Sequence, residues 1–159
     1  MLNETLLQKL SDWRPAGSGR HVLGTTDEQS GWSASVNADR CDSMGCLVWE
    51  FSLSRKAVLA GATLRGWADS AARRVISLVD VLKVIEVDEG RGEALLRSEQ
   101  PSQRGDFVLY YEVHLRGTTA ATVRRYQAKH QPGSHREQIA FALTHEALAK
   151  LAADLTAQA

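Results

Sequence analysis

The stretch FVLYYEVHLR, residues 107–116, places an apolar or aromatic side chain at every second position. Alternate side chains of a β-strand point to the same face, so this pattern predicts a strand with one buried face. Its predicted inner row is Phe107, Leu109, Tyr111, Val113 and Leu115. Glu112 and His114 alternate onto the opposite, outer face. This is the strongest strand signal in the chain, and we expect the sheet to form around it.

The loop after this strand sets the register of the next strand. A two-residue loop of Gly117 and Thr118 places Tyr111 opposite Arg124. A three-residue loop places Glu112 opposite Arg124 instead, which pairs opposite charges. A slip of one residue moves every side chain of the second strand to the other face of the sheet. The choice of loop therefore decides which face Arg124 occupies.

A second hairpin favours the two-residue loop. Closing it symmetrically about residues 132–133, Pro-Gly, places Tyr126 opposite Ile139 and Arg124 opposite Phe141. Only the two-residue loop then brings the apolar row of the last strand onto the same face as the row that begins at Phe107. We therefore predict that Arg124 lies on the inner face of the sheet.

An inner-face arginine needs a partner or a route to water. In one interpretation the stem of Arg124 packs on aromatic rings and its guanidinium reaches solvent or an acid of the central helix, Asp69 or Asp80. In the other, Arg124 binds a small anion in a pocket with aromatic walls. The candidate ligand-binding residues are Arg124, Tyr111, Tyr126 and Phe141.

The second hairpin ends in a cluster of basic and imidazole side chains. These are Lys129, His130, His135 and Arg136, with His130 expected opposite His135. Two imidazoles between two cations disfavour a divalent metal. We interpret this basic hairpin end as a solvated turn, and we expect no metal or other cofactor there. Contact with a phosphate or an acidic partner is the alternative.

Three amphipathic segments predict helices. The first is capped by Asn3 and ends near residue 13, and the third begins after a capping Thr144. Between them, apolar residues recur at three- and four-residue steps over residues 64–82, which predicts a long central helix. His145 and Glu146 follow Thr144, but position 149 is Ala, so the zinc-protease pattern of two His four residues apart is absent.

The remaining periodic segments predict antiparallel strands. Leu47, Trp49, Phe51 and Leu53 form the expected inner row of one of them. Cys41 and Cys46 lie in the turn before that row, and we expect two reduced thiols. The whole chain predicts one α+β domain, residues 1–159. It should contain antiparallel sheet of about seven to eight strands, with the N-terminal, central and C-terminal helices on its apolar face.

Composition narrows the function class. The chain has 159 residues, 43% apolar and 24% charged, with 19 basic and 19 acidic side chains. These proportions are typical of a folded globular domain. Zero net charge makes general nucleic-acid binding unlikely, because such proteins need a positive field. The chain shows neither a signal-peptide pattern nor an apolar run of membrane-spanning length, so we expect a cytoplasmic protein without membrane association.

The order of the predicted elements is similar to that of secretion-chaperone-like and other helix-on-sheet interaction folds. The similarity covers most of the chain, involves no shared motif and does not fix a function. The acidic balance expected of a secretion chaperone is missing. Our first functional hypothesis is a non-enzymatic module that binds another protein, with a homodimer as one form of such binding. A small-anion-binding domain around Arg124 is the second hypothesis, and an enzyme using Glu112 and His114 is the third.

Overall fold

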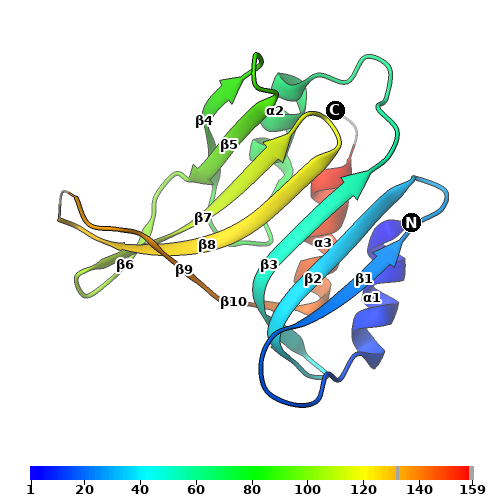
Figure 1. Cartoon of the computed structure of the whole chain (residues 1–159), viewed down its shortest axis with the longest axis horizontal. Helices are drawn as coiled ribbons and strands as arrows, with labels where there is room; N and C mark the ends of the chain where they lie inside the picture. The colour runs from blue at the N-terminus through cyan, green and yellow to red at the C-terminus, as the bar shows by residue number, and fades with distance from the viewer. Residues whose placement is uncertain (132, 158–159) are drawn as a thin grey trace.

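The computed structural model describes residues 1–131 and 133–157, which form three helices and ten strands (Figure 1). The helices are α1 (Leu2–Asp12), α2 (Leu64–Arg74) and α3 (His145–Thr156). The strands are β1 (His21–Thr26), β2 (Trp32–Cys41), β3 (Gly45–Arg55), β4 (Leu82–Asp88), β5 (Glu93–Ser98), β6 (Ser102–Arg104), β7 (Phe107–Arg116), β8 (Ala120–Lys129), β9 (Glu137–Ile139) and β10 (Phe141–Thr144). The α+β class is confirmed. Within the described residues, no helix is long and apolar enough to cross a membrane.

The strands form one antiparallel sheet. Its main path runs β1-β2-β3-β8-β7-β5-β4, and the short strands β6, β9 and β10 pair with β7, β8 and β3 respectively. The seven strands of the main path agree with the predicted size of the sheet. β1 and β6 were not among the strands predicted from the sequence. The interrupted pair β9 and β10 was predicted as one strand.

All three helices lie behind the sheet in the view of Figure 1. Their apolar side chains and those of the strands form one core. We call the sheet face that the helices cover the inner face, and the opposite one the outer face. Buried helix residues in the core include Leu2, Leu6 and Leu10 of α1, Leu64, Ala68 and Ala71 of α2, and Leu148, Leu151 and Leu155 of α3. The predicted packing of the helices on the apolar sheet face is therefore present.

The helix ends differ in how well the sequence predicted them. Thr144 caps α3 as expected, because its hydroxyl accepts a hydrogen bond from the backbone N–H of Ala147 at 3.0 Å. The expected cap at Asn3 is wrong, since Asn3 lies inside α1 and Met1 occupies the N-cap position without a side-chain cap. α1 ends at Asp12, close to the predicted end.

The central helix is shorter than its apolar periodicity predicted. α2 ends at Arg74, and the chain then turns through Val79, whose φ is 70°. Val75, Leu78 and Leu82 are nevertheless buried, as the periodicity required, whereas Val79 of the same predicted stripe is 92% exposed. A loop that runs across the core can bury the same residues as a helix, so periodicity alone did not locate the end of α2.

Strands β2 and β3 contain compensating irregularities. The register between them shifts on both sides of Ala38, where Trp49 and Asp39 are the residues left without a direct partner. As a result Val48 and Phe51 are both buried, whereas Leu47 and Trp49 are only partly buried. The predicted common row of Leu47, Trp49, Phe51 and Leu53 is therefore wrong, because a bulge reverses the alternation within β3.

The hairpin between β7 and β8 has a three-residue loop. Arg116 pairs with Ala120, and Gly117 in the loop has a φ of 55°, a value that glycine adopts readily. Glu112 therefore lies opposite Arg124. The predicted two-residue loop is wrong, and the alternative that paired these opposite charges is the one that forms. The inner row Leu109, Tyr111, Val113 and Leu115 is buried as predicted.

The sheet divides between β3 and β8. These strands pair only where Phe51–Ser54 meets Ala120–Val123. Beyond that point β10 pairs with β3 and β9 pairs with β8, so the two short strands fill the space where the longer ones diverge. Gln138 fixes this insertion, because its side-chain N–H donates a hydrogen bond to the carbonyl of Trp49 at 2.9 Å.

Candidate functional sites

Arg124 lies on the outer face of the sheet, and this corrects the predicted inner-face position. Its Nε donates to Glu50 Oε2 at 2.8 Å, and 42% of its side chain is exposed. The predicted binding group is divided between the two faces. Tyr111 and Phe141 pack together on the inner face with ring centroids 5.3 Å apart, whereas Tyr126 shares the outer face with Arg124. The four residues therefore do not form one pocket.

Arg125 occupies the inner-face position that was predicted for Arg124. It lies directly opposite Tyr111, and its guanidinium carbon is 4.7 Å from the centroid of the Tyr111 ring. Burial raises the pKa of Tyr111. The Nε of Arg125 is buried and has no hydrogen-bond partner among the described residues. The interpretation of an arginine stem packed on aromatic rings, which was made for Arg124, thus describes Arg125 instead.

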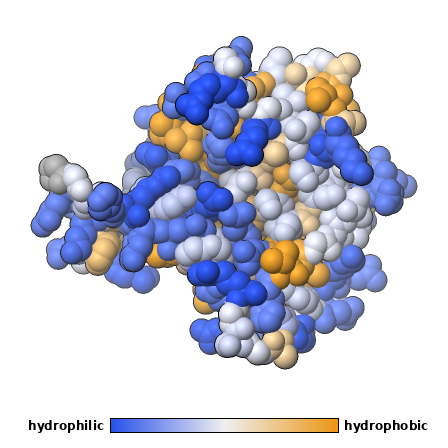
Figure 2. Space-filling view, in the orientation of Figure 1, coloured by the Kyte–Doolittle hydropathy of each residue, from blue (hydrophilic) through white to orange (hydrophobic). Residues whose placement is uncertain are grey.

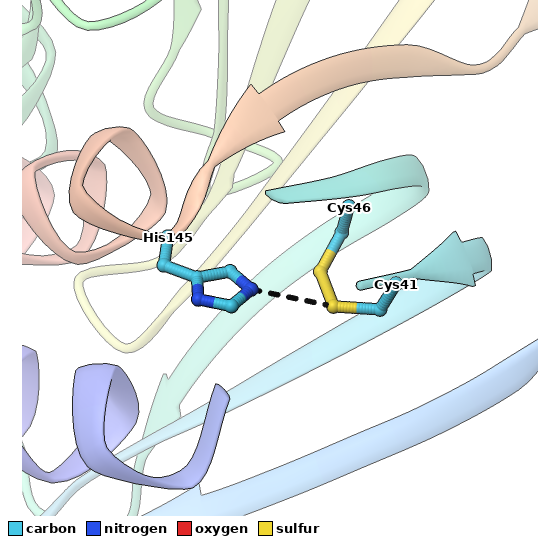
Figure 3. A group of neighbouring side chains, drawn as sticks. All are labelled: Cys41, Cys46 and His145. Atoms are coloured by element: carbon cyan, nitrogen blue, oxygen red, sulfur yellow. Dashed lines mark hydrogen bonds between the residues drawn. A yellow bond between two sulfur atoms is a disulfide. The ribbon is translucent and has the colours of Figure 1, made fainter. Parts of the chain in front are cut away.

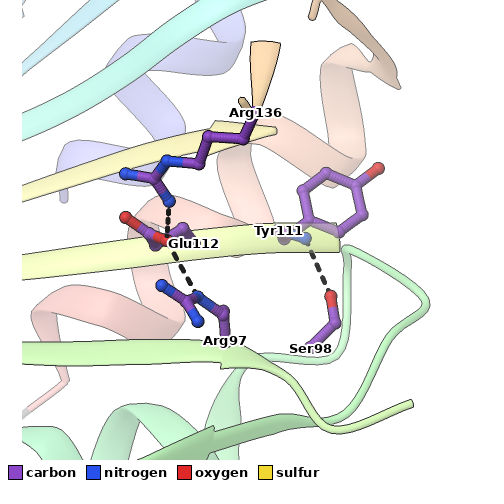
Figure 4. Close-up of polar contacts among 5 residues, drawn as sticks. All are labelled: Arg97, Ser98, Tyr111, Glu112 and Arg136. Atoms are coloured by element: carbon purple, nitrogen blue, oxygen red, sulfur yellow. Dashed lines mark hydrogen bonds and ion pairs between the residues drawn. The ribbon is translucent and has the colours of Figure 1, made fainter. Parts of the chain in front are cut away.

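Asp80, which the sequence offered as a partner for Arg124, has a different role. Its Oδ2 accepts a hydrogen bond from the hydroxyl of Ser98 at 2.7 Å. The same hydroxyl accepts the backbone N–H of Tyr111 at 2.8 Å (Figure 4). The loop after α2 is in this way attached to β5 and β7.

Glu112 is the most buried carboxylate of the outer face, with only 10% of its side chain exposed. Its Oε2 accepts hydrogen bonds from Arg97 Nε at 3.0 Å and from Arg136 Nη1 at 2.5 Å (Figure 4). Desolvation opposes the charge of Arg136, but its hydrogen bond to Glu112 raises its pKa above the ordinary value. His114, the other residue of the enzyme hypothesis, lies beside a different carboxylate, with its Nε2 3.8 Å from Glu93 Oε1.

Arginine and aromatic side chains pack against one another around Glu112. Arg136 lies 3.9 Å from the centroid of the Tyr126 ring, and Tyr126 stacks on Tyr110 with centroids 5.9 Å apart. Further along the same face, Arg20 lies 3.7 Å from the centroid of Trp49. We call these residues the arginine–aromatic cluster: Arg20, Trp49, Arg97, Tyr110, Tyr126 and Arg136.

The other half of the outer face consists of small side chains. A groove of about 500 Å³ runs over β1, β2 and β3. We call it the serine groove and define it by its outward-pointing residues Gly24, Thr26, Ser33, Ser35, Ser52 and Ser54. Figure 2 shows this region as a pale area of intermediate hydropathy beside strongly hydrophilic side chains. The ion pair of Glu50 and Arg124 lies between the groove and the arginine–aromatic cluster, by the register of β3 and β8.

The basic hairpin end projects away from the body of the molecule (Figure 1). Lys129, His130, His135 and Arg136 are all exposed. Pro132, one of the two residues at the predicted turn centre, lies outside the described residues. His130 does not pair with His135 in a strand ladder, since β8 ends at Lys129 and β9 begins at Glu137. Arg136 points back to Glu112, so it belongs to the arginine–aromatic cluster as well.

A separate cavity of about 330 Å³ lies where α2, α3 and the ends of β2 and β3 meet. Trp32 and Trp67 form part of its wall, with ring centroids 5.9 Å apart. Arg55 lies 4.7 Å from the centroid of Trp32 and donates from Nη2 to the carbonyl of Thr118 at 3.0 Å. Its Nε is buried without a hydrogen-bond partner among the described residues, and burial lowers its pKa. No sequence pattern distinguishes this arginine from the others.

Cys41 and Cys46 lie opposite each other on β2 and β3 and form a disulfide (Figure 3). The expectation of two free thiols is therefore wrong for this structure, because antiparallel pairing brings the two sulfur atoms together. His145, the first residue of α3, points at this pair, and its Nε2 is 3.6 Å from Cys41 Sγ. In the sequence, His145 opens a helix and lacks a second His four residues later, so no metal site was expected there. The C-x4-C spacing was the available signal, but the third residue comes from a distant segment.

Comparison with known protein families, curated proteins and solved structures finds none that matches the chain.

Proposed function

We propose that the chain is a protein-binding module of the cytoplasm whose outer sheet face contacts the partner. The observation that supports this proposal is the serine groove beside the arginine–aromatic cluster, on a sheet face over which none of the described helices lies. Small side chains allow the backbone of a partner strand or helix to approach the sheet closely. Tyr, Trp and Arg are the residue types most enriched at the energetic centres of protein interfaces.

The contacts within the cluster support the same proposal. Glu112 holds two arginines of the cluster, Arg97 and Arg136, in fixed positions, so these side chains lose little conformational freedom when a partner binds. Stacking of Tyr126 between Tyr110 and Arg136 fixes the rings in the same way. A preorganised surface of this kind favours binding by another folded protein or by a second copy of the chain.

The test is a steric block of the serine groove. Ser35 points outward from β2, and its side chain forms no hydrogen bond among the described residues, so Ser35→Trp should fill the groove without unfolding the protein. Ser11→Trp on the exposed side of α1 is the matched control. The parent and both variants are purified from the protein's own host and examined by native mass spectrometry.

We expect a second protein chain, or a second copy, in the parent and in Ser11→Trp and its loss in Ser35→Trp. A partner that remains bound to Ser35→Trp would show that the outer face is not the contact surface. A parent that is monomeric and free of partners would contradict the proposal itself.

A second candidate function is the binding of a small anion in the cavity beside Arg55. The unpartnered Nε of Arg55 supports it, because a buried donor without a partner costs free energy that an anionic ligand can recover. The cavity volume of about 330 Å³ suits a small molecule, and Trp32 and Trp67 offer it an aromatic wall. This proposal moves the predicted anion site from Arg124 to Arg55.

Thermal unfolding with phosphate, sulfate or benzoate tests the second candidate, with sodium chloride of equal ionic strength as the reference. At about ten times the dissociation constant, a bound anion should raise the melting temperature by about 3 °C. The response should disappear in Arg55→Met and persist in Arg73→Met, a change at an exposed position of α2. Equal responses in the two variants, or none in the parent, would exclude an anion site at Arg55.

A further inference from the structure

We propose that Cys41, Cys46 and His145 bind a single Zn²⁺ ion when the disulfide is reduced, so that oxidation and metal binding exclude each other. This site is separate from the outer face and does not depend on the proposed partner. The ligand atoms of these three side chains all lie within 4.8 Å of one another.

The distances fit a tetrahedral zinc ion. Zinc lies about 2.3 Å from a thiolate sulfur and about 2.0 Å from an imidazole nitrogen, so two ligands of one tetrahedral ion are about 3.5 to 3.8 Å apart. His145 Nε2 is 3.6 Å from Cys41 Sγ, already at this separation. The two cysteines have C-x4-C spacing in a hairpin, which is within the range that zinc sites use. Once their bond is broken, the two sulfur atoms can move apart to the separation that a zinc ion requires.

The backbone holds the third ligand in place independently of the disulfide. The backbone N–H of His145 donates to the carbonyl of Met44 in the β2–β3 turn at 3.1 Å. Gly45 of the same turn packs so closely on β10 that an added Cβ would lie 2.5 Å from the carbonyl oxygen of Leu143. The turn and the start of α3 are therefore in direct contact, and His145 is only 4% exposed. Reduction of the disulfide leaves these contacts intact.

A fourth coordination position would face solvent. A groove of about 750 Å³ lies beside both cysteines. Asp42 is the carboxylate nearest in sequence, but its Oδ1 already accepts the backbone N–H groups of Met44 and Gly45 at 2.8 and 3.0 Å. We therefore assign the fourth position to water, which a small thiolate, carboxylate or imidazole ligand can replace from the groove.

The charges and electrons balance in this scheme. A dithiol reductant supplies two electrons and two protons, the bond between the sulfur atoms breaks, and two thiols form as the reductant becomes a disulfide. Zn²⁺ then displaces both thiol protons, and two thiolates with neutral His145 give a complex without net charge. A neutral complex suits a pocket in which Cys46 and His145 are buried. A reducing compartment such as the cytoplasm would keep the site in its metal-binding form.

The first experiment compares reduced and oxidised protein. Both forms are freed of metal with a chelator, exchanged into metal-free buffer and titrated with Zn²⁺, and the bound metal is measured by atomic emission. Titration with Co²⁺ gives an independent readout, because thiolate ligands produce a sulfur-to-cobalt charge-transfer band. We expect a single bound ion and the charge-transfer band in the reduced form, and neither in the oxidised form. Equal binding by the two forms, or no binding by the reduced form, would overturn the proposal.

Three variants identify the ligands, and far-UV circular dichroism checks that each is folded. Cys41→Ser and His145→Asn should each weaken zinc binding by at least about 100-fold in the reduced protein. A double change of His130 and His135 to Ala should leave it unchanged, because those residues lie on the basic hairpin end. Full affinity in Cys41→Ser or His145→Asn, or loss of affinity in the double variant, would contradict the proposed set of ligands. The cobalt spectrum of the parent remains decisive if a variant fails to fold.

Discussion

Replacing Glu112 by Gln should destabilise the protein far more than the same change at Glu50. Both residues are carboxylates on the outer face that accept hydrogen bonds from arginine. Glu112 has two arginine partners and a side chain that is 10% exposed, whereas Glu50 has one ion-pair partner, Arg124, and a side chain that is 30% exposed. Gln keeps the shape of the side chain but removes the charge, so the comparison isolates the ion pairs.

The contacts of Glu112 set the size of the effect. A hydrogen bond to a charged group contributes about 1.5 to 3 kcal/mol. Arg97 and Arg136 are 38% and 41% exposed and regain some hydration when the charge of Glu112 is removed. Each hydrogen bond therefore contributes a reduced amount to stability, about 1 kcal/mol. We therefore expect Glu112→Gln to lower the free energy of unfolding by about 2 kcal/mol. For Glu50→Gln, with a single partner and more solvent, we expect about 0.5 kcal/mol.

Urea unfolding at pH 7 measures both changes. With a slope of about 2 kcal/mol per molar urea, the midpoint should fall by about 1 M for Glu112→Gln and by about 0.25 M for Glu50→Gln. Most of the difference should persist in 1 M sodium chloride, because salt screens a buried charge less than an exposed one. If the midpoint of Glu112→Gln falls no further than that of Glu50→Gln, the two arginines do not stabilise the fold through this carboxylate.

Three further predictions concern single residues. Arg124→Met should change the free energy of unfolding by less than about 1 kcal/mol. The difference in melting temperature between this variant and the parent should be the same with and without phosphate. A larger loss of stability in urea unfolding would show that Arg124 is a structural anchor. Gly45→Ala should cost about 1 to 3 kcal/mol, because the new methyl group meets a backbone carbonyl that cannot move freely, and an unchanged urea midpoint would contradict that contact. Hydrogen bonds from the backbone N–H groups of Met44 and Gly45 lower the pKa of Asp42 below 3.8. The stability from this carboxylate is therefore complete above the pKa of the unfolded chain and is lost as the pH falls through the lower folded value, so Asp42→Asn should flatten the acid side of a plot of urea midpoint against pH. Parallel curves for Asp42→Asn and the parent would contradict this assignment.

The sequence predicted the elements better than their registers. The inner row of β7, the cap at Thr144 and the presence of three helices follow from local patterns, and all are present. The face of Arg124 depended on one residue of loop length, and Gly117 with its positive φ belongs to a three-residue loop. Because strand alternation has a period of two, this single residue moved Arg124 and Tyr126 to the outer face and Arg125 to the inner one.

The candidate sites were harder to predict than the fold. Cys41 and Cys46 are visible in the sequence as a C-x4-C pair, but His145 meets them only because β10 pairs with β3 and delivers the start of α3 to the hairpin. The serine groove likewise needs β1, β2 and β3 to lie side by side. Local periodicity contains no information on contacts between distant segments. A bulge such as the one near Trp49 also reverses the alternation of inner and outer side chains within a strand.

The insertion of β9 and β10 between β3 and β8 has a consequence for synthesis on the ribosome. The edge of β3 from Gly45 to Val48 has its partner only after Phe141–Thr144 has left the exit tunnel. α1, which precedes all ten strands in the sequence, packs against α3, which follows them. Until residues 141–156 are available, the nascent chain therefore holds an unpaired strand edge and an uncovered apolar helix, and chaperones bind such surfaces. The fold can therefore be completed only after residues 141–156 have been made, and slow elongation before that point should increase aggregation of the nascent protein.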